Sequence, residues 1–317
     1  MPDANDTSAG YIDLQVNGYA GVDFNHDSLT PASLRHACER MRADGVEACL
    51  ATIITAQPDA IARRLARLAQ WREQDELIKS VIRGLHIEGP ALNPADGFRG
   101  AHDLQAIQPA SVDLFMPLLE AGGGLVRMVT LAPEYDPGMA TIRRLSREGC
   151  LVSAGHCDAS LDQLREAIDA GLRLYTHLGN GCPMNMHRHD NIIQRCLHLR
   201  DALTICFIAD GVHVPYVALA NYLALTGDEG AVVVTDAMAA AGLGPGNYTL
   251  GHWEIEVGED LAAWAPGRAH LVGSAMTMRQ AHANLHEHLG LDAQQITRLT
   301  RTNAGLLLDE IEAANVK

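Results

Sequence analysis

Residues 151–178 read LVSAGHCDASLDQLREAIDAGLRLYTHL and contain one complete strand–helix–strand unit. The apolar runs Leu151–Ser153 and Leu172–Tyr175 predict two buried strands, and Ser160–Ala170 between them has the spacing of an amphipathic helix. Strands that are apolar along their whole length are typical of a parallel sheet that is covered on both faces. This stretch therefore predicts an architecture in which parallel strands alternate with helices.

The same unit recurs along the chain, whose 317 residues are a normal length for a single (β/α)8 barrel. Amphipathic stretches such as Pro31–Ala43 and Pro215–Leu225 alternate with further short apolar runs. Eight strands in this order predict a closed barrel of the TIM type. The six other predicted strands are Tyr11–Val16, Ala48–Ile54, Val81–Ile87, Leu125–Leu131, Leu203–Ile208 and Ala231–Val234.

The domain organisation follows from this pattern. We expect a single catalytic barrel domain over residues 11–317, preceded by a disordered or extended tail at 1–10. The segment 237–273 is rich in glycine and proline, and its run HWEIEV predicts a loop with a small hairpin. Two helices, roughly Ala275–Leu289 and Asp292–Leu308, then close the chain.

The composition indicates which classes of partner and which cellular compartment to expect. The formal net charge of −15 argues against binding to nucleic acid or to an anionic membrane surface. The sequence contains no run of about 18 apolar residues, so it predicts no transmembrane helix. The acidic start MPDANDTSAG does not resemble a signal peptide. Seven cysteines without a CxxC motif indicate a reduced, cytoplasmic protein.

Reactive side chains follow the predicted strands, at the end of the barrel where active sites of this fold lie. Glu88, His156 and His177 follow the third, fifth and sixth strands. Two imidazoles and a carboxylate with room for water predict a site for one divalent metal, zinc first, with iron, manganese or cobalt as alternatives. Asp236 ends the eighth strand, and we expect it to take a proton from the attacking water and pass it to a leaving amine.

Other candidate ligands have simpler explanations. Cys157 is interpreted as a small core residue. The role of His187 and His189, in the loop segment MHRHDN, stays open. Three further histidines lack the HExxH pattern and are interpreted as a solvated helix face: His282, His286 and His288.

The chain resembles the N-acetylglucosamine-6-phosphate deacetylases of the amidohydrolase superfamily. The resemblance runs from Ile12 to about Gly305 and depends on the combination of several segments. They are IDLQVNG, GLHIEGPALN with GFRGAH, SAGHCDAS, THLGNGCP, IADGVHV, VTDAM with GLGPGNYTLG, and VGSAMTM with NAG. The resemblance implies a barrel that binds an amino-sugar substrate and acts as a homodimer.

The resemblance also implies roles for single residues. The three residues named above match the metal ligands of the family, and Asp236 matches its catalytic aspartate. Gln15 and Asn17 stand where many members of the superfamily have an HxH motif and a second metal. Two amides cannot replace two imidazoles as ligands of a transition metal, so we expect a single metal and assign both amides to substrate binding.

The remaining matches concern the substrate. Ala101 and His102 in RGAH match a substrate-binding segment whose histidine helps to polarise the substrate carbonyl. Asn180, Gly181 and His213 match residues that hold the sugar phosphate, partly through backbone N–H groups. The resemblance therefore predicts a site with separate groups for the acetyl and phosphate ends of the substrate.

The chain departs from the family in three places. Family members usually carry terminal segments that form a small β-sandwich, and we expect this chain to lack that domain. The segment after His177 reads HLGNGCP where the family is close to HLYNAMP. Arg188 is the nearest candidate for a phosphate-binding arginine that the partner subunit often supplies in the family, and the alternative is that it lies on the surface or in a subunit contact.

The leading hypothesis is hydrolysis of the N-acetyl group of an amino sugar, N-acetylglucosamine-6-phosphate first, to acetate and the free amine. A different N-acyl substrate in the same pocket is the main alternative. A non-catalytic sugar-phosphate sensor is a third hypothesis, but a sensor needs neither a metal site nor a base. A phosphate-binding barrel isomerase is a weaker fourth, because the chain lacks the expected base beside a glycine-rich phosphate loop.

Overall fold

The structure of the chain is a computed structural model that describes residues 10–250, 253–265, 267 and 271–315. The tail predicted at 1–10 lies, except for Gly10, outside the described residues. No helix in the described ranges is long and apolar enough to span a membrane.

Eight parallel strands form the predicted barrel, and their order in the sheet follows their order in the chain. The ring closes where Val16, at the end of the first strand, pairs with Ala237 just after the last one. The fold class expected from the sequence is therefore confirmed. The strands are β1 (Tyr11–Val16), β4 (Val46–Ile54), β5 (Ile82–Glu88), β6 (Val126–Leu131), β7 (Leu151–Ala154), β8 (Leu172–Tyr175), β9 (Thr204–Ile208) and β10 (Ala231–Val234).

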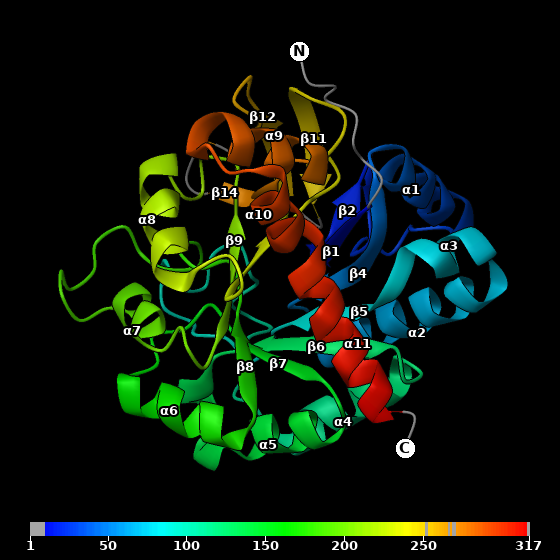
Figure 1. The fold of residues 1–317 in the computed structure, drawn as a ribbon. Coiled ribbons are helices and arrows are strands. Elements are labelled where there is room, and N and C mark those ends of the chain that lie inside the picture. Colours follow the sequence, from blue (N-terminus) through cyan, green and yellow to red (C-terminus); the bar gives the residue numbers. More distant parts are fainter. Residues whose placement is uncertain (1–9, 251–252, 266, 268–270, 316–317) are drawn as a thin grey trace.

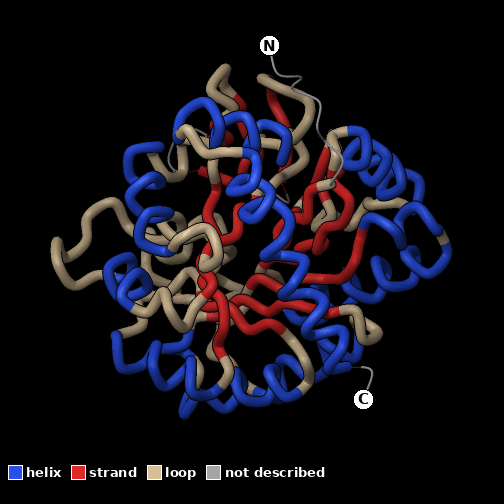
Figure 2. Tube along the Cα trace, viewed as in Figure 1, coloured by secondary structure: helices blue, strands red, loops and turns tan. Residues whose placement is uncertain are grey.

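Helices surround the strands, as Figures 1 and 2 show. Eight of them follow the barrel strands, and the last three come after a second sheet. A π-helical turn at Arg298–Thr302 joins the final two helices into one longer element than the sequence predicts. The helices are α1 (Pro31–Ala43), α2 (Pro58–Gln74), α3 (Glu76–Val81), α4 (Val112–Ala121), α5 (Ala140–Arg147), α6 (Leu161–Ala170), α7 (Ile192–His198), α8 (Tyr216–Thr226), α9 (Met278–Leu289), α10 (Ala293–Thr297) and α11 (Asn303–Asn315).

Helix α6 shows how local sequence sets these elements. The Ser160 hydroxyl accepts a hydrogen bond from the Gln163 backbone N–H, and the Gln163 side chain accepts one from the Ser160 N–H. This capping box starts the helix, and Gly171 ends it with a φ of 113° that favours glycine. Leu164 and Ala167 are fully buried, so the helix lies against the barrel along its apolar face.

The segment after β10 differs from the prediction of a loop with one hairpin. It forms a four-stranded antiparallel sheet with strands β11 (Gly246–Leu250), β12 (Trp253–Val257), β13 (Ala262–Trp264) and β14 (Leu271–Ser274). Strands of three to five residues, two of them bounded by glycine, show too little periodicity to be recognised from sequence.

This small sheet has its own apolar cluster, which includes Met238, Ile255, Val257 and Val272. A parallel bridge between Ala237 and Ser274 joins β14 to the end of the barrel. The sheet therefore lies next to the barrel mouth, where the predicted site residues meet.

Candidate active site

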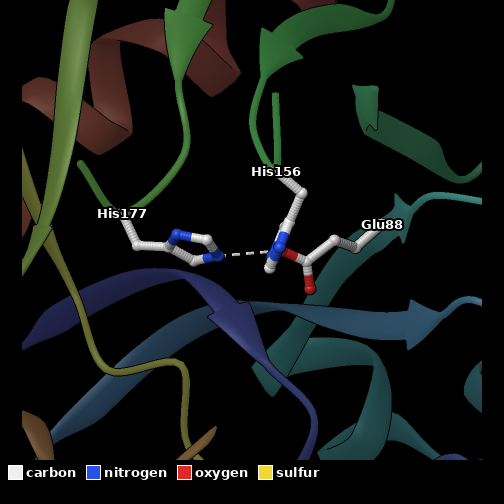
Figure 3. A group of neighbouring side chains, drawn as sticks. All are labelled: Glu88, His156 and His177. Atoms are coloured by element: carbon white, nitrogen blue, oxygen red, sulfur yellow. Dashed lines mark hydrogen bonds and ion pairs between the residues drawn. The ribbon is translucent and has the colours of Figure 1, made fainter. Parts of the chain in front are cut away.

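Three buried side chains converge at the carboxyl end of the barrel. Glu88 ends β5, His156 lies two residues after β7, and His177 lies two residues after β8. One nitrogen or oxygen of each side chain lies within 4.8 Å of the other two, and Figure 3 shows the three groups pointing toward one another. The expected ligand set is thus brought together in space.

The hydrogen bonds of this cluster suit a metal ion. Glu88 Oε1 is 3.0 Å from His177 Nε2 and 3.4 Å from His156 Nε2. His156 Nδ1 lies 2.7 Å from the Phe98 carbonyl oxygen, to which it donates, so that its Nε2 keeps a lone pair for a ligand. Two imidazole nitrogens and a carboxylate form a donor set typical of zinc and related ions. The cluster fits a divalent metal site.

The charge state of Glu88 also favours a cation. Burial alone would raise its pKa, but hydrogen bonds and positive charge from His156 and His177 hold that pKa well below the usual range. The side chain is therefore an ionised carboxylate.

The backbone is strained at three of the site residues. His156, His177 and Asp236 have φ values of 51°, 32° and 52°, in the left-handed region that residues other than glycine rarely adopt. Such conformations cost about 1–3 kcal/mol each and gather at functional sites. The strain turns each side chain into the barrel mouth immediately after its strand, and it supports a functional role for all three.

Two amides hold the catalytic candidate Asp236. Its Oδ1 accepts hydrogen bonds from Gln15 Nε2 at 3.0 Å and from Asn17 Nδ2 at 2.7 Å. Gln15 Nε2 also donates to Glu88 Oε1 at 3.1 Å, so that Gln15 links the two carboxylates. Burial raises the pKa of Asp236, and the nearby charge of Glu88 raises it further. Neither amide donates to Oδ2, the other oxygen of the Asp236 carboxylate.

His102 approaches the same cluster from the loop after β5. Its Nδ1 is 2.8 Å from Thr55 Oγ1, and its Nε2 is 3.3 Å from His156 Nε2. Burial, and to a smaller degree the charge of His156, lower the pKa of His102 to about 3. The imidazole is therefore neutral at working pH, when it can donate one hydrogen bond and accept another.

A cavity of about 50 Å³ lies at this cluster. Leu271 and Gly273 of β14 form part of its wall, which the sequence did not indicate because their position depends on the second sheet. The lining residues are Asn17, Ile54, Glu88, Gly100, Ala101, His102, His156, Asn180, Asp236, Leu271 and Gly273.

The expected phosphate-binding residues are only partly brought together. Asn180 lines the cavity, and Gly181 packs against the His156 ring. His213 Nδ1 lies 2.6 Å from Asp210 Oδ2, while its buried Nε2 has no hydrogen-bond partner within the described ranges. Arg188 is exposed and does not line the cavity.

A second cavity, of about 430 Å³, lies beside the loop that contains Arg188. The arginine that lines it is Arg195 of α7, whose guanidinium contacts Asp158 at 2.9 Å and Asp190 at 2.6 Å. Sequence reasoning missed Arg195 because it lies on a helix and not at the end of a strand. His187 lines the same cavity.

Gly181→Ala is expected to weaken metal binding by about 10- to 100-fold, the usual effect of disturbing a group that orients a ligand. A Cβ at this position would lie 2.8 Å from His156 Nδ1, where the ring donates to the Phe98 carbonyl. Metal content and affinity, measured by chelator competition, test this.

Gly290→Ala is the matched control. Gly290, which ends α9, has a φ of 67° and a ψ of 22°, its φ is close to the 62° of Gly181, and a Cβ there would meet no atom within 4 Å. Both substitutions place alanine at a positive φ, at a similar cost of about 1–2 kcal/mol. Equal metal affinity in the two variants would contradict the proposed contact with His156.

No family model matches the chain. The chain is 32% identical over 298 residues to the N-acetylglucosamine-6-phosphate deacetylase of Bacillus subtilis. That alignment covers 93% of this chain and 73% of the Bacillus protein. It is 34% identical over 282 residues to the human N-acetylglucosamine-6-phosphate deacetylase, in an alignment that covers 85% of this chain and 66% of the human protein.

Solved structures of deacetylases of this family are also similar to the chain. A mutant of the N-acetyl-D-glucosamine-6-phosphate deacetylase of Mycobacterium smegmatis, in complex with N-acetyl-D-glucosamine-6-phosphate, matches with a TM-score of 0.85 at 31% identity. That match covers 95% of this chain and 77% of the other. The deacetylase of Pasteurella multocida matches with a TM-score of 0.85 at 27% identity and covers 96% and 77% of the two chains.

Proposed function

The chain belongs to the N-acetylglucosamine-6-phosphate deacetylase family and is an amidohydrolase of that type, and on this premise we propose that it removes the N-acetyl group of N-acetylglucosamine-6-phosphate. The products are acetate and the free amino sugar phosphate. The observation that carries the proposal is the convergence of Glu88, His156 and His177 on one point, with Asp236 held beside them by Gln15.

One divalent ion, zinc first, is held by Glu88, His156 and His177 in this proposal. When bound, such an ion supplies Lewis acidity and brings the pKa of water to about 7. We assign one ion and not two because Gln15 and Asn17 offer amides where a second transition metal would need imidazoles, and their N–H groups are used on the carboxylates of Glu88 and Asp236.

Asp236 is the acid–base residue. Since Oδ1 accepts from both amides, Oδ2 takes the proton of the attacking water and then delivers it to the leaving nitrogen. One carboxylate serves both steps because they are sequential. His102 donates a hydrogen bond to the carbonyl oxygen of the acetyl group, where negative charge develops.

The sugar phosphate is assigned to Asn180, the Gly181 N–H and His213, with Arg188 as a further charged donor. The unpartnered Nε2 of His213 supports this, because a buried imidazole nitrogen without a partner is costly unless a ligand satisfies it. Ala101 lines the cavity beside His102 and is assigned to substrate contact.

We further propose a single catalytic domain over residues 11–317 that acts as a homodimer. All seven cysteines are free thiols, which supports a reducing compartment such as the cytoplasm.

A neutral N-acyl compound is the second candidate substrate. The position of Arg188 favours it, because this side chain is exposed, lines neither cavity at the mouth, and makes no ion pair within the described part of the chain. An anionic substrate would then meet a protein of net charge −15 with little local compensation.

Acetate release from N-acetylglucosamine, with and without the 6-phosphate, tests the substrate. We expect the phosphorylated sugar to be preferred by about tenfold or more in kcat/KM, and Arg188→Ala to reduce that preference. Arg63→Ala is the matched control, since Arg63 is an exposed arginine of α2. Equal use of both sugars by the wild type would favour the neutral N-acyl substrate instead.

A further inference from the structure

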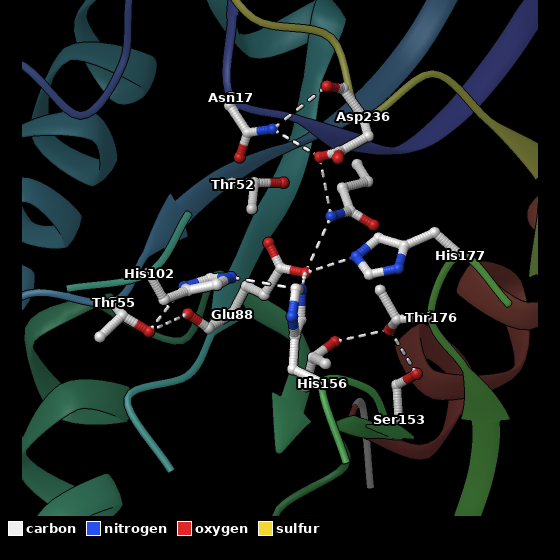
Figure 4. A network of polar contacts seen from close by, with 12 residues as sticks. Asn17, Thr52, Thr55, Glu88, His102, Ser153, His156, Thr176, His177 and Asp236 are labelled. Atoms are coloured by element: carbon white, nitrogen blue, oxygen red, sulfur yellow. Dashed lines mark hydrogen bonds and ion pairs between the residues drawn. The ribbon is translucent and has the colours of Figure 1, made fainter. Parts of the chain in front are cut away.

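Thr55 lies directly after β4 and contacts two parts of the site at once. Its side chain is almost fully buried, with an exposure of 6%. Thr55 Oγ1 lies 2.8 Å from His102 Nδ1 and 3.3 Å from the Glu88 carbonyl oxygen, as Figure 4 shows. The hydroxyl has one hydrogen, so it donates either to the histidine or to the carbonyl.

The turn after Glu88 confines this hydroxyl. Gly89 has a φ of 82°, and a Cβ at that position would overlap Thr55 Oγ1. The backbone can therefore pass against the hydroxyl only because residue 89 is glycine. Thr55 is held between the Glu88 turn and the loop that carries His102.

The protons of the neighbouring histidines decide which way the hydroxyl donates. His156 Nδ1 donates to the Phe98 carbonyl, so in the neutral ring that a metal ligand requires, Nε2 has a lone pair and no hydrogen. His102 Nε2 lies 3.3 Å from that nitrogen. A proton on His102 Nε2 makes this contact a hydrogen bond, whereas a proton on Nδ1 would place two lone pairs against each other.

With its proton on Nε2, His102 needs a donor at Nδ1, and the Thr55 hydroxyl is 2.8 Å away. The alternative acceptor, the Glu88 carbonyl oxygen, is more distant at 3.3 Å. The hydrogen bonds then run in one direction, from Thr55 through His102 and His156 to the Phe98 carbonyl.

We propose that Thr55 is a positioning residue that keeps His102 in the tautomer with its proton on Nε2. This tautomer presents an N–H toward the three proposed metal ligands. That N–H can donate to the substrate carbonyl once His156 Nε2 binds the metal. The inference rests on the proposed function for the role of His102, and it adds the residue that sets its protonation pattern.

Thr55→Val keeps the shape of the side chain and removes the hydroxyl. We expect kcat to fall by about 10- to 100-fold, less than the loss of a complete oxyanion donor, with KM within about twofold of the wild type. Thr55→Ser keeps the hydroxyl and removes only the methyl group, and its kcat is expected to stay within about threefold of the wild type. Thr297→Val in α10 is the control for removing a threonine hydroxyl outside the site, since the Thr297 hydroxyl donates to the Ala293 backbone carbonyl of the same helix.

A second readout does not depend on activity. In metal-free protein labelled with ¹⁵N-histidine, long-range proton–nitrogen spectra report which ring nitrogen of His102 carries the proton, and His102→Gln assigns its signals. We expect Nε2 protonation in the wild type and in Thr55→Ser, and a shift toward Nδ1 protonation or a mixture in Thr55→Val.

Two results would overturn the proposal: an unchanged His102 tautomer in Thr55→Val, or equal losses of kcat in the valine and serine variants. Equal losses would mean that Thr55 acts through packing alone. A wild type that deacetylates no N-acetyl amino sugar would refute the proposed function, while the tautomer measurement would still decide the role of Thr55.

Discussion

Asp236→Asn leaves the barrel and the metal site in place and lowers kcat by about 10²- to 10⁴-fold. The asparagine oxygen can still accept from Gln15 Nε2 and Asn17 Nδ2, so the local hydrogen bonds are kept. The amide nitrogen that replaces Oδ2 can neither accept the proton of water nor deliver one to the leaving nitrogen. Acetate release at saturating substrate, with metal content measured on the same sample, checks this expectation.

Asp136→Asn is the matched control for removing a buried carboxylate. Asp136 is 3% exposed and accepts hydrogen bonds from the backbone N–H groups of Thr141 and Ile142 at the start of α5. We expect this variant to lower the melting temperature and to keep the wild-type kcat. If Asp236→Asn kept more than about a tenth of the activity, another residue would have to act as the base.

Glu88→Gln is expected to abolish most activity by loss of the metal. The neutral amide removes the only charged donor of the three, and it no longer attracts the cation that two histidines alone would hold more weakly. We expect metal affinity to fall by about 100-fold or more, beyond the usual effect of changing a group outside the ligand set. Metal analysis and chelator competition measure it.

Glu134→Gln is the control for this variant. Glu134 is another carboxylate near the barrel mouth, but its Oε1 accepts from Asn93 Nδ2 and from the Asp158 backbone N–H, and it is not in the ligand cluster. Its metal content should match the wild type at one ion per chain. Two stoichiometric ions at the barrel mouth of the wild type would contradict the role assigned to Gln15 and Asn17.

The sequence by itself determined the barrel and the three residues of its candidate metal site. Short apolar strands alternate with amphipathic helices, and this periodicity is a local property of the chain. Parallel strands of a barrel bring their carboxyl ends to one face, so residues that follow different strands must meet there. Glu88, His156 and His177 could therefore be identified together before their distances were known, and the structure places them within 4.8 Å.

Only the tertiary structure decided how these groups are oriented and enclosed. The contact between Thr55 and His102, the packing of Gly181 on His156 and the wall that Leu271 forms join residues far apart in the sequence. Such contacts depend on loop paths and on the second sheet, whose short strands have too little periodicity to be read locally. The left-handed backbone of the strand-end residues has the same origin, because surrounding packing and not the residue's own preference stabilises it.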